Sequence, residues 1–564
     1  MNALERLVER IWLRNYPPGV PAEIDPGRYR SLKQLFEASF ENFRTRPSYT
    51  NMDVTLTYDD MDEMSRRFGA WLQHGAGLRK GDRVALMMPN VLQYPVAIFG
   101  VLRAGLTVVN TNPLYTPREL EHQLKDSGAK VIVILENFAH VLEQVIARTD
   151  VQHVVVTGVG DLLGFPKSAL VNFVLRRVRK QVPKYHLPGA LRFNEVLRRG
   201  RSQELQPVDL GHEDIAFLQY TGGTTGVSKG AVLTHGNMVA NVLQSGAWLS
   251  KATAKDRDIV ITALPLYHIF SLTANCLVFM ESGAQNILIT NPRDFPGFVK
   301  ELKKYPFTYI SGVNTLFNAL LNTPGFDSVD FSRLSITLGG GMAVQRAVAE
   351  RWKQVTGNVL TQAWGLTETS PAACINPFEI KEFNGSIGLP ISSTEVSIRD
   401  DDGRDLGTNQ LGEICVRGPQ VMRGYWNRPD ETEKVMFAGG WLRTGDVGRM
   451  DDDGFVYIED RKKDMILVSG FNVYPNEVES VAVTHPGVLE VAAVAQTDER
   501  AGEVVALFVV KKDPNLTASE LIEHSRKSLT AYKVPKYVYF RSELPKTNVG
   551  KILRRALRDE LSKT

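Results

Sequence analysis

The residues best suited to chemistry lie in one glycine-rich stretch near the middle of the chain. Residues 220–230 read Tyr-Thr-Gly-Gly-Thr-Thr-Gly-Val-Ser-Lys-Gly. Glycine lets a backbone turn sharply and bring its N–H groups close to an anion, and Lys229 adds a positive charge. In a Walker loop lysine directly follows glycine, whereas here Val227 and Ser228 separate Gly226 from Lys229. The stretch predicts a phosphate-binding loop, and a polar turn between two strands is the alternative.

Four further segments carry residue types that suit a nucleotide and its reaction. Residues 339–341 are glycines, which would let the backbone approach a flat ligand. Trp364 offers an aromatic face for a purine, and Glu368 offers a carboxylate for a cation. Asp446 would suit a ribose diol, and Lys551 directly follows a glycine. Each residue also has a purely structural interpretation: the tryptophan could belong to the core, the aspartate could cap a turn and the lysine could lie on the surface. Taken singly, the residues leave both interpretations open.

The composition is that of a protein with at least two domains. A chain of 564 residues is too long for one compact core. The 66 basic and 63 acidic residues give a net charge of +3, which is too small to indicate nucleic-acid binding. Cys276, Cys374 and Cys415 lie far apart in the sequence, so they predict neither a disulfide framework nor a zinc site and fit a reducing cytoplasm.

The sequence carries no signal for secretion or for a membrane span. Acidic residues interrupt the first twelve positions, whereas a secretory signal has a basic start and an unbroken apolar stretch. No apolar run approaches the ~18 residues that cross a bilayer. We therefore expect a cytoplasmic protein that is soluble or lies on a membrane surface. Residues 172–180 are basic and amphipathic, which suits either an anionic lipid surface or an ordinary surface helix.

Strands and helices alternate in the first half of the chain. Residues 83–88, 106–109 and 131–135 are strand candidates, and helical spacing runs from residue 94 to 102. Residues 116–119, Thr-Pro-Arg-Glu, predict a helix start with a capping box and proline in the first turn. This alternation implies a largely parallel, doubly wound sheet.

The character of the chain changes near the charged residues 460–464. Short strands are predicted at residues 491–494 and 504–510, followed by a helix that Thr517 and Glu520 cap. Roughly 100 residues are enough for a small α+β domain. The predicted domains are therefore residues 1–461 and 462–564, with a linker at about 460–464.

Together and in this order, these segments resemble the adenylate-forming superfamily of acyl-CoA synthetases, luciferases and peptide-synthetase adenylation domains. Within it, the chain is similar to bacterial long-chain fatty-acid–CoA ligases. Residues 440–467 are similar to the fatty-acyl signature of that family, and residues 90–95, 112–120 and 469–475 strengthen the match. The resemblance implies an α/β fold, with a large N-terminal domain of doubly wound sheets and helices and a small, mobile α+β C-terminal domain.

The resemblance implies a reaction in two steps that uses Mg²⁺. ATP and a long-chain fatty acid form acyl-AMP and pyrophosphate, and the thiol of CoA then attacks acyl-AMP to give acyl-CoA and AMP. Adenylation is needed because a carboxylate would otherwise have to expel oxide. Negative charge spreads over the α-phosphate in the transition state, so cations and aligned donors are required.

Two alternatives to this function stay open. One is a medium-chain or aryl-acid CoA ligase, because the ATP-binding motifs do not select the acid. The other is a non-catalytic fatty-acid-binding or uptake protein with the same fold. The presence of Lys229, Glu368, Asp446 and Lys551 argues against the second.

The resemblance also implies roles for individual residues. The expected catalytic residues are Lys551, which bridges the fatty carboxylate and the α-phosphate, Glu368 and His268. The expected ATP- and AMP-binding residues are Thr221, Gly222, Gly223, Thr224, Thr225, Gly226, Lys229, Gly339, Gly340, Gly341, Trp364, Gly365, Thr367, Asp446 and Arg461. Thr221 and Glu368 are expected to contact Mg²⁺. The expected acyl and CoA contacts are Tyr267, Ser469, Gly470 and Phe471, and the expected hinge is Lys462 or Lys463.

The chain departs from the family pattern at two positions: Trp364, and Thr369, which follows Glu368 where close relatives vary. The family usually has tyrosine where this chain has Trp364, so we expect a modest change in nucleotide affinity. The expected partners are a long-chain fatty acid, ATP and CoA, with no nucleic acid. A homodimer and a peripheral contact with the inner face of the cytoplasmic membrane are further expectations.

Overall fold

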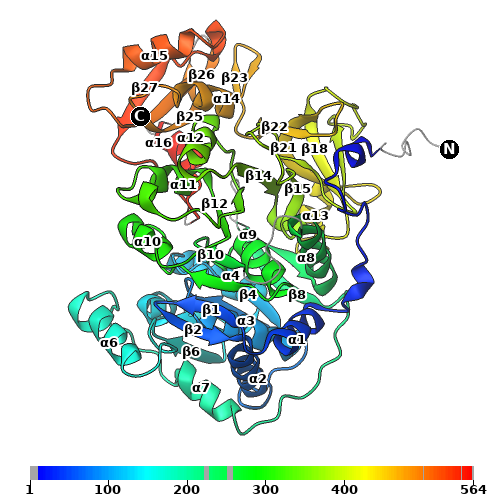
Figure 1. Cartoon of the computed structure of the whole chain (residues 1–564), viewed down its shortest axis with the longest axis vertical. Coiled ribbons are helices and arrows are strands. Elements are labelled where there is room, and N and C mark those ends of the chain that lie inside the picture. Colours follow the sequence, from blue (N-terminus) through cyan, green and yellow to red (C-terminus); the bar gives the residue numbers. More distant parts are fainter. Residues whose placement is uncertain (1–9, 222–227, 251–257, 499–500, 548, 562–564) are drawn as a thin grey trace, which may run out of the picture.

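The structure of the protein is a computed structural model. It describes residues 10–221, 228–250, 258–498, 501–547 and 549–561. Figure 1 shows a large N-terminal domain and, at the top of the view, a small C-terminal domain in orange and red. The chain passes from one to the other between β22 (Val456–Arg461) and β23 (Ile466–Val468).

Two large sheets form the frame of the N-terminal domain. The first has the order β19 (Gly424–Tyr425), β9 (Lys229–Thr234), β8 (Ile215–Thr221), β4 (Thr107–Asn110), β3 (Arg83–Met87), β5 (Ala129–Leu135), β6 (His153–Thr157) and β7 (Leu191–Arg192). The second has the order β16 (Leu389–Pro390), β15 (Ala372–Ile375), β14 (Leu360–Gly365), β13 (Ile336–Gly339), β12 (Tyr309–Gly312), β10 (Ile259–Thr262), β11 (Gln285–Leu288), β1 (Pro47–Asn51) and β2 (Val54–Thr57). Their inner strands pair in parallel, and antiparallel pairs occur toward the edges.

Helices cover these sheets, and the covered strands are apolar for that reason. The main helices are α1 (Leu32–Phe43), α2 (Tyr58–His74), α3 (Gln93–Arg103), α4 (Pro117–Ser127), α7 (Phe193–Gly200), α8 (His235–Leu249), α10 (Phe295–Leu302), α11 (Asn314–Leu321) and α12 (Arg346–Thr356). All of α3 is buried, so it needs no polar face. Strands of a parallel sheet are likewise buried on both faces, which explains the unbroken apolar runs.

The predicted elements of the first half are confirmed. β3, β4 and β5 pair in parallel, and α3 follows β3. At the start of α4 the Glu119 N–H donates to the Thr116 side chain, and the Thr116 N–H donates to the Glu119 carboxylate at 2.8 Å. These reciprocal bonds satisfy donors that a helix start leaves without partners. Gly128, with φ +60°, ends the helix in the left-handed region that favours glycine.

Two smaller sheets complete the molecule. The third sheet contains β17 (Glu395–Arg399), β18 (Gly412–Arg417), β21 (Trp441–Met450), β20 (Met436–Phe437) and β22. The C-terminal sheet contains β24 (Phe471–Val473), β23, β26 (Gly502–Lys511), β25 (Val488–Asp498) and β27 (Tyr537–Arg541), with helices α14 (Pro475–Ala482), α15 (Ala518–Arg526) and α16 (Arg554–Leu561). Its buried apolar residues form clusters of their own. The predicted strands and the Thr517–Glu520 capping box are present.

Candidate active site

A cavity of about 1100 Å³ is bounded by residues of both domains. Its wall contains the ends of β8 and β14, the loop after β13, the end of β22 and the loop that precedes α16. The predicted site residues that line it are Thr221, Lys229, Tyr267, His268, Gly340, Gly341, Trp364, Gly365, Thr367, Glu368, Asp446, Arg461, Lys463 and Lys551. Residues separated by more than three hundred positions are thus brought to one place.

Other predicted residues lie elsewhere. Gly339 ends β13 behind the cavity wall, where a Cβ atom would lie 2.5 Å from Leu360 Cδ2. Ser469 and Gly470, with φ +50° and +87°, form the turn between β23 and β24. Phe471 is exposed and stacks on Tyr532 with ring centroids 4.9 Å apart. In this arrangement of the domains, therefore, the predicted CoA contacts are outside the cavity. The predicted residues Gly222, Gly223, Thr224, Thr225 and Gly226 lie outside the described residues.

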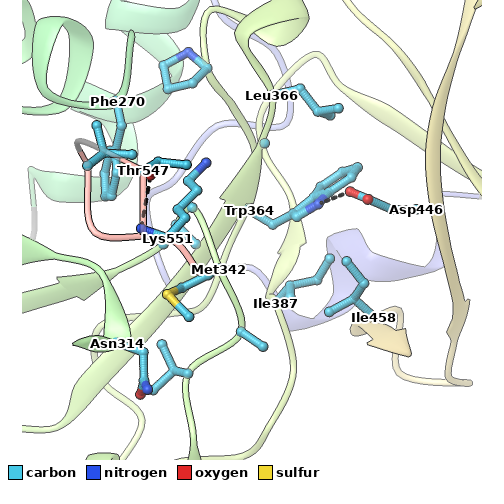
Figure 2. Close-up of a pocket in the computed structure, with 18 of the residues that line it drawn as sticks. Phe270, Asn314, Met342, Trp364, Leu366, Ile387, Asp446, Ile458, Thr547 and Lys551 are labelled. Atoms are coloured by element: carbon cyan, nitrogen blue, oxygen red, sulfur yellow. Dashed lines mark hydrogen bonds between the residues drawn. The ribbon is translucent and has the colours of Figure 1, made fainter. Parts of the chain in front are cut away.

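Lys551 reaches from the C-terminal domain into the cavity. Its backbone N–H donates to Thr547 Oγ1 at 3.0 Å (Figure 2), and the preceding carbonyl of Gly550 accepts from the Thr315 hydroxyl of the N-terminal domain at 2.8 Å. A Cβ atom on Gly341 would lie 3.1 Å from Lys551 Cε, and Gly341 has φ +77°. Glycine is therefore required there both by the backbone and by the approach of the lysine.

The charge of Lys551 is set by its surroundings. Burial lowers the pKa of Lys551 to about 8, and the Arg461 charge adds to this, while Asp446 and Glu368 oppose it. The ammonium is the major form at neutral pH and lacks a full complement of anionic neighbours. A cation in this state is suited to an anionic ligand, because the ligand supplies the missing counter-charge.

Trp364 and Asp446 form a pair on the opposite wall (Figure 2). The indole Nε1–H donates to Asp446 Oδ2 at 2.9 Å, across 82 residues of sequence. Arg461 Nε lies 2.9 Å from Asp446 Oδ1 in an ion pair, without the alignment of a hydrogen bond, and Oδ1 has no hydrogen-bond partner among the described residues. A buried carboxylate oxygen without such a partner is suited to a hydroxyl donor, such as a ribose diol.

The pair predicts a measurable role for the indole N–H. In Trp364→Phe the aromatic face stays, but Asp446 loses a donor, so we expect the KM for ATP to rise roughly two- to twelvefold, which corresponds to about 0.5–1.5 kcal/mol for one hydrogen bond. Trp352→Phe is the matched control, because its indole donates to Thr337 at 3.0 Å away from the cavity. Steady-state kinetics with ATP varied measure both. An equal rise in KM in the two variants would contradict the assignment.

Glu368 belongs to a chain of polar contacts that the sequence did not reveal. It lies in the short helix Thr367–Thr369, and the Tyr425 hydroxyl donates to its Oε1 at 2.7 Å. Burial raises the pKa of Tyr425, so it remains a donor. Lys229 lies with its Nζ 5.1 Å from the centre of the Tyr425 ring and forms an ion pair with Glu431. The only sequence signal for Tyr425 was the aromatic pair that it forms with Trp426.

The donor set around Glu368 fits a hard cation that is held mainly by phosphate. Glu368 supplies a carboxylate, and Thr221 at the end of β8 supplies a hydroxyl. Within the described ranges, no group of three or more His, Cys, Asp or Glu side chains is arranged to hold a metal. Mg²⁺ commonly binds through one or two carboxylates together with substrate phosphates and water, so these two residues fit it.

His268 and its neighbours border the apolar part of the cavity. The Phe270 N–H donates to His268 Nδ1 at 3.3 Å, which places the ring proton on Nε2. Burial, with a contribution from the Lys551 charge, lowers the pKa of His268 to about 3, so the ring is neutral at physiological pH. The apolar residues lining the cavity include Leu249, Ile269, Phe270, Ala274 and Met342. This wall is suited to a hydrocarbon chain rather than to a second charged group.

An ion-pair cluster holds the C-terminal domain to the end of β22. Arg554, in the first turn of α16, lies 3.1 Å from Asp460 and 2.8 Å from Glu479. The Lys462 N–H donates to the Gly445 carbonyl at 3.0 Å, whereas Asp464 pairs with Arg558 of α16 at 2.9 Å. Lys463 therefore lies between a residue bound to the N-terminal domain and one bound to the C-terminal domain.

Comparison with known proteins gives relatives along almost the whole chain. The long-chain-fatty-acid–CoA ligase of Escherichia coli O157:H7 is 58% identical over 553 residues, which cover 98% of each chain. That of Haemophilus influenzae is 53% identical over 556 residues, covering 98% of this chain and 99% of the relative. ATP-bound MatB from Rhodopseudomonas palustris superposes with a TM-score of 0.81 at 25% identity, covering 94% of this chain and 99% of that one. An anthranilate CoA ligase in complex with anthranoyl-AMP gives a TM-score of 0.85 at 24% identity, covering 96% and 99%, and this likeness concerns the fold.

Two family models match the same chain. The model described as AMP-binding enzyme matches residues 36–426, and the model described as AMP-binding enzyme C-terminal domain matches residues 477–551. The first spans the frame of the cavity, and the second ends at the lysine that enters it. The chain belongs to the family of AMP-binding enzymes.

Proposed function

We propose that this protein is an AMP-forming long-chain fatty-acid–CoA ligase. It converts a fatty acid, ATP and CoA to acyl-CoA, AMP and pyrophosphate through an acyl-adenylate. The observation that carries the proposal is the convergence of Lys551, Glu368 and the Trp364–Asp446 pair on one cavity that also has an apolar wall. The identity of 58% to a long-chain-fatty-acid–CoA ligase over nearly the full length supports the choice of acid.

In the first half-reaction, residues of both domains hold ATP and the acid. Trp364 stacks on adenine, and Asp446 accepts from the ribose hydroxyls beside Arg461. Thr221, Lys229 and the glycine-rich loop hold the β- and γ-phosphates. Thr221 and Glu368 would hold Mg²⁺, which, when bound, neutralises phosphate charge.

The chemical step is a displacement at the α-phosphorus. A carboxylate oxygen of the fatty acid attacks the α-phosphorus, and the bond to the bridging oxygen of pyrophosphate breaks. Lys551 touches both the carboxylate and the α-phosphate, so its charge is matched to the charge that spreads there in the transition state. His268 is neutral and presents a donor rather than a second positive charge beside the carboxylate.

A panel of acids tests the function and its alternatives. Pyrophosphate release and thioester formation are measured with hexanoate, laurate, palmitate, oleate and benzoate. We expect the highest kcat/KM for palmitate or oleate, because each buried methylene adds about 0.8 kcal/mol to binding in an apolar site. Preference for hexanoate or benzoate would contradict the long-chain assignment and favour a medium-chain or aryl-acid ligase. If no acid causes pyrophosphate release, a non-catalytic binding protein is favoured instead.

The second half-reaction requires the C-terminal domain to move. Lys551 occupies the cavity, while Ser469, Gly470 and Phe471 lie outside it. Rotation about residues 460–464 would withdraw the lysine and bring the turn at Ser469 to the acyl-adenylate, where glycine leaves room for the pantetheine arm of CoA. Of the two expected hinge residues, Lys463 is the better pivot, because the Lys462 N–H is bonded within the N-terminal domain.

Proline at the pivot is expected to separate the two half-reactions. Proline fixes φ near −65°, so Lys463→Pro should block one of two backbone states. We expect acyl-AMP formation within a few-fold of the parent and thioester formation about tenfold slower or worse. Rapid-quench measurement of acyl-AMP and acyl-CoA gives both rates.

The control for the pivot is Lys462→Ala. This variant loses the ion pair with Asp401 but keeps the backbone donor, so both rates should stay close to those of the parent. A folded Lys463→Pro protein that makes acyl-CoA at the parental rate would reject Lys463 as the pivot.

The place of action that we propose is the cytoplasm, with a peripheral contact at the inner face of the cytoplasmic membrane. None of the helices within the described residues combines the length and apolar character needed to cross a bilayer. A long-chain acid partitions into membranes, so an enzyme at the surface meets more substrate than one in bulk water. A homodimer is a further proposal, which light scattering of the purified protein tests.

A further inference from the structure

Large apolar side chains are exposed together on one short segment of the N-terminal domain. Ten such side chains are exposed among the described residues, and four of them lie between positions 165 and 178. Phe165 is 91% exposed, Leu170 63%, Phe173 58% and Val178 65%. Single exposed apolar residues are ordinary, but a cluster of this size on one segment marks an interaction surface.

The segment is an ordered part of the fold. Helix α6 (Lys167–Phe173) continues into one π-helical stretch (Val174–Val178). On the inner side, Val171 and Leu175 pack against the main core. The buried Asn172 accepts from the Gly160 N–H at 2.9 Å through Oδ1 and donates to Asp161 at 2.9 Å through Nδ2. Figure 1 shows α6 at the outer margin of the molecule, far from the C-terminal domain.

The charged residues within this segment of the chain have one sign. No acidic residue occurs between Asp161 and Glu195, whereas seven lysines and arginines do. Three of the seven are committed to the fold: Arg176 and Arg192 pair with the buried Glu136, and Lys167 lies 3.6 Å from Asp53. The other four, Arg177, Arg179, Lys180 and Lys184, are exposed.

This arrangement changes the expectation drawn from residues 172–180. Arg176 belongs to the basic stretch that would suit a lipid surface or an ordinary surface helix, but both oxygens of Glu136 bind it, at 2.9 and 2.7 Å. Replacing Arg176 would leave the buried Glu136 carboxylate with Arg192 as its only cation among the ion pairs described, and would therefore test stability rather than lipid binding.

We propose that Phe165, Leu170, Phe173 and Val178, termed here the docking face, insert into the headgroup region of an anionic lipid bilayer. Apolar side chains that enter the acyl boundary, with cations beside them at the level of the phosphates, are the features of an interfacial helix. If two copies of this chain associated through this face, the cations of one copy would lie against those of the other. Their repulsion disfavours self-association through this face. An anionic membrane satisfies both the apolar and the cationic residues.

Vesicle binding of the full chain tests the apolar residues. Vesicles of phosphatidylglycerol and phosphatidylethanolamine are sedimented with the parent, with Leu170→Ser/Phe173→Ser, and with the control Leu114→Ser/Leu411→Ser, which removes two comparably exposed leucines elsewhere. We expect the partition coefficient to fall about tenfold or more in the first variant, and to stay within a factor of two in the control. Thermal unfolding checks that each variant is folded.

The cations are tested separately. In Arg177→Gln/Arg179→Gln/Lys180→Gln, binding at low salt should fall roughly a hundredfold, at about 1 kcal/mol for each residue near an anionic surface, and the loss should shrink at high salt. Lys303→Gln/Lys512→Gln/Lys527→Gln removes the same charge from scattered exposed positions and should have little effect.

Insertion into the bilayer is measured with a fluorescent label on the docking face. The three native cysteines are buried, so Phe173→Cys supplies an accessible thiol for an environment-sensitive label. Its emission should shift to the blue on addition of the anionic vesicles, while a label at Leu411→Cys should not shift. Unchanged vesicle binding by Leu170→Ser/Phe173→Ser, or a label at position 173 that stays in water, overturns the proposal. Loss of a dimer in that variant, with vesicle binding intact, would identify a protein interface instead.

Discussion

Replacement of Lys551 by alanine is expected to reduce acyl-AMP formation by about a thousandfold. Removing one preorganised group from a developing oxyanion costs about 10²–10³ in rate, and Lys551 faces both the carboxylate and the α-phosphate. Thioester formation from supplied acyl-AMP should change only a few-fold, because rotation has by then withdrawn residue 551. Single-turnover measurement of the two half-reactions provides the test, and an equal loss in both would reject the role.

The loop of Lys551 offers a matched control. Lys546 lies in the same loop but pairs with Glu490 of its own domain at 2.6 Å, so Lys546→Ala should retain adenylation within a few-fold. The pKa of Lys551, about 8, adds a second test. The cation is required and is lost as pH rises through this pKa, so kcat/KM for adenylation should fall above about pH 8. Lys551→Arg keeps its charge there, and its profile should lack that fall.

Glu368→Gln is expected to slow adenylation by about a hundredfold and to raise the concentration of Mg²⁺ that half-maximal activity requires. Glutamine retains an oxygen that can accept from Tyr425, but it lacks the negative charge that a hard cation prefers. Rates measured over a Mg²⁺ titration at saturating ATP separate the two effects.

Tyr425→Phe serves as the comparison for Glu368. It leaves the carboxylate in place and removes only its hydrogen bond, so the Mg²⁺ requirement should change much less than in Glu368→Gln. If Mg²⁺ dependence is the same in Glu368→Gln and in the parent, Glu368 is structural. Its backbone carbonyl, which accepts from the Met422 N–H at 2.7 Å, would then be its main contribution.

The sequence by itself determined the elements whose signals are local. The capping boxes at Thr116 and Thr517 join residues three positions apart, and the apolar run at residues 131–135 reflects burial on both faces of a parallel sheet. Resemblance along the whole chain also named fourteen of the residues that line the cavity, Lys551 among them. Such signals depend on neighbouring residues or on the order of motifs, so they can be recognised without knowledge of the tertiary structure.

Only the tertiary structure decided how those residues act on one another. Trp364 donates to Asp446, Tyr425 orients Glu368, and Arg554 joins Asp460 to the C-terminal domain. It also placed Gly339 behind the cavity wall and bound Arg176 to Glu136. These contacts join residues far apart in the chain. Their partners depend on the packing of sheets and domains, and no local pattern of residues specifies that packing.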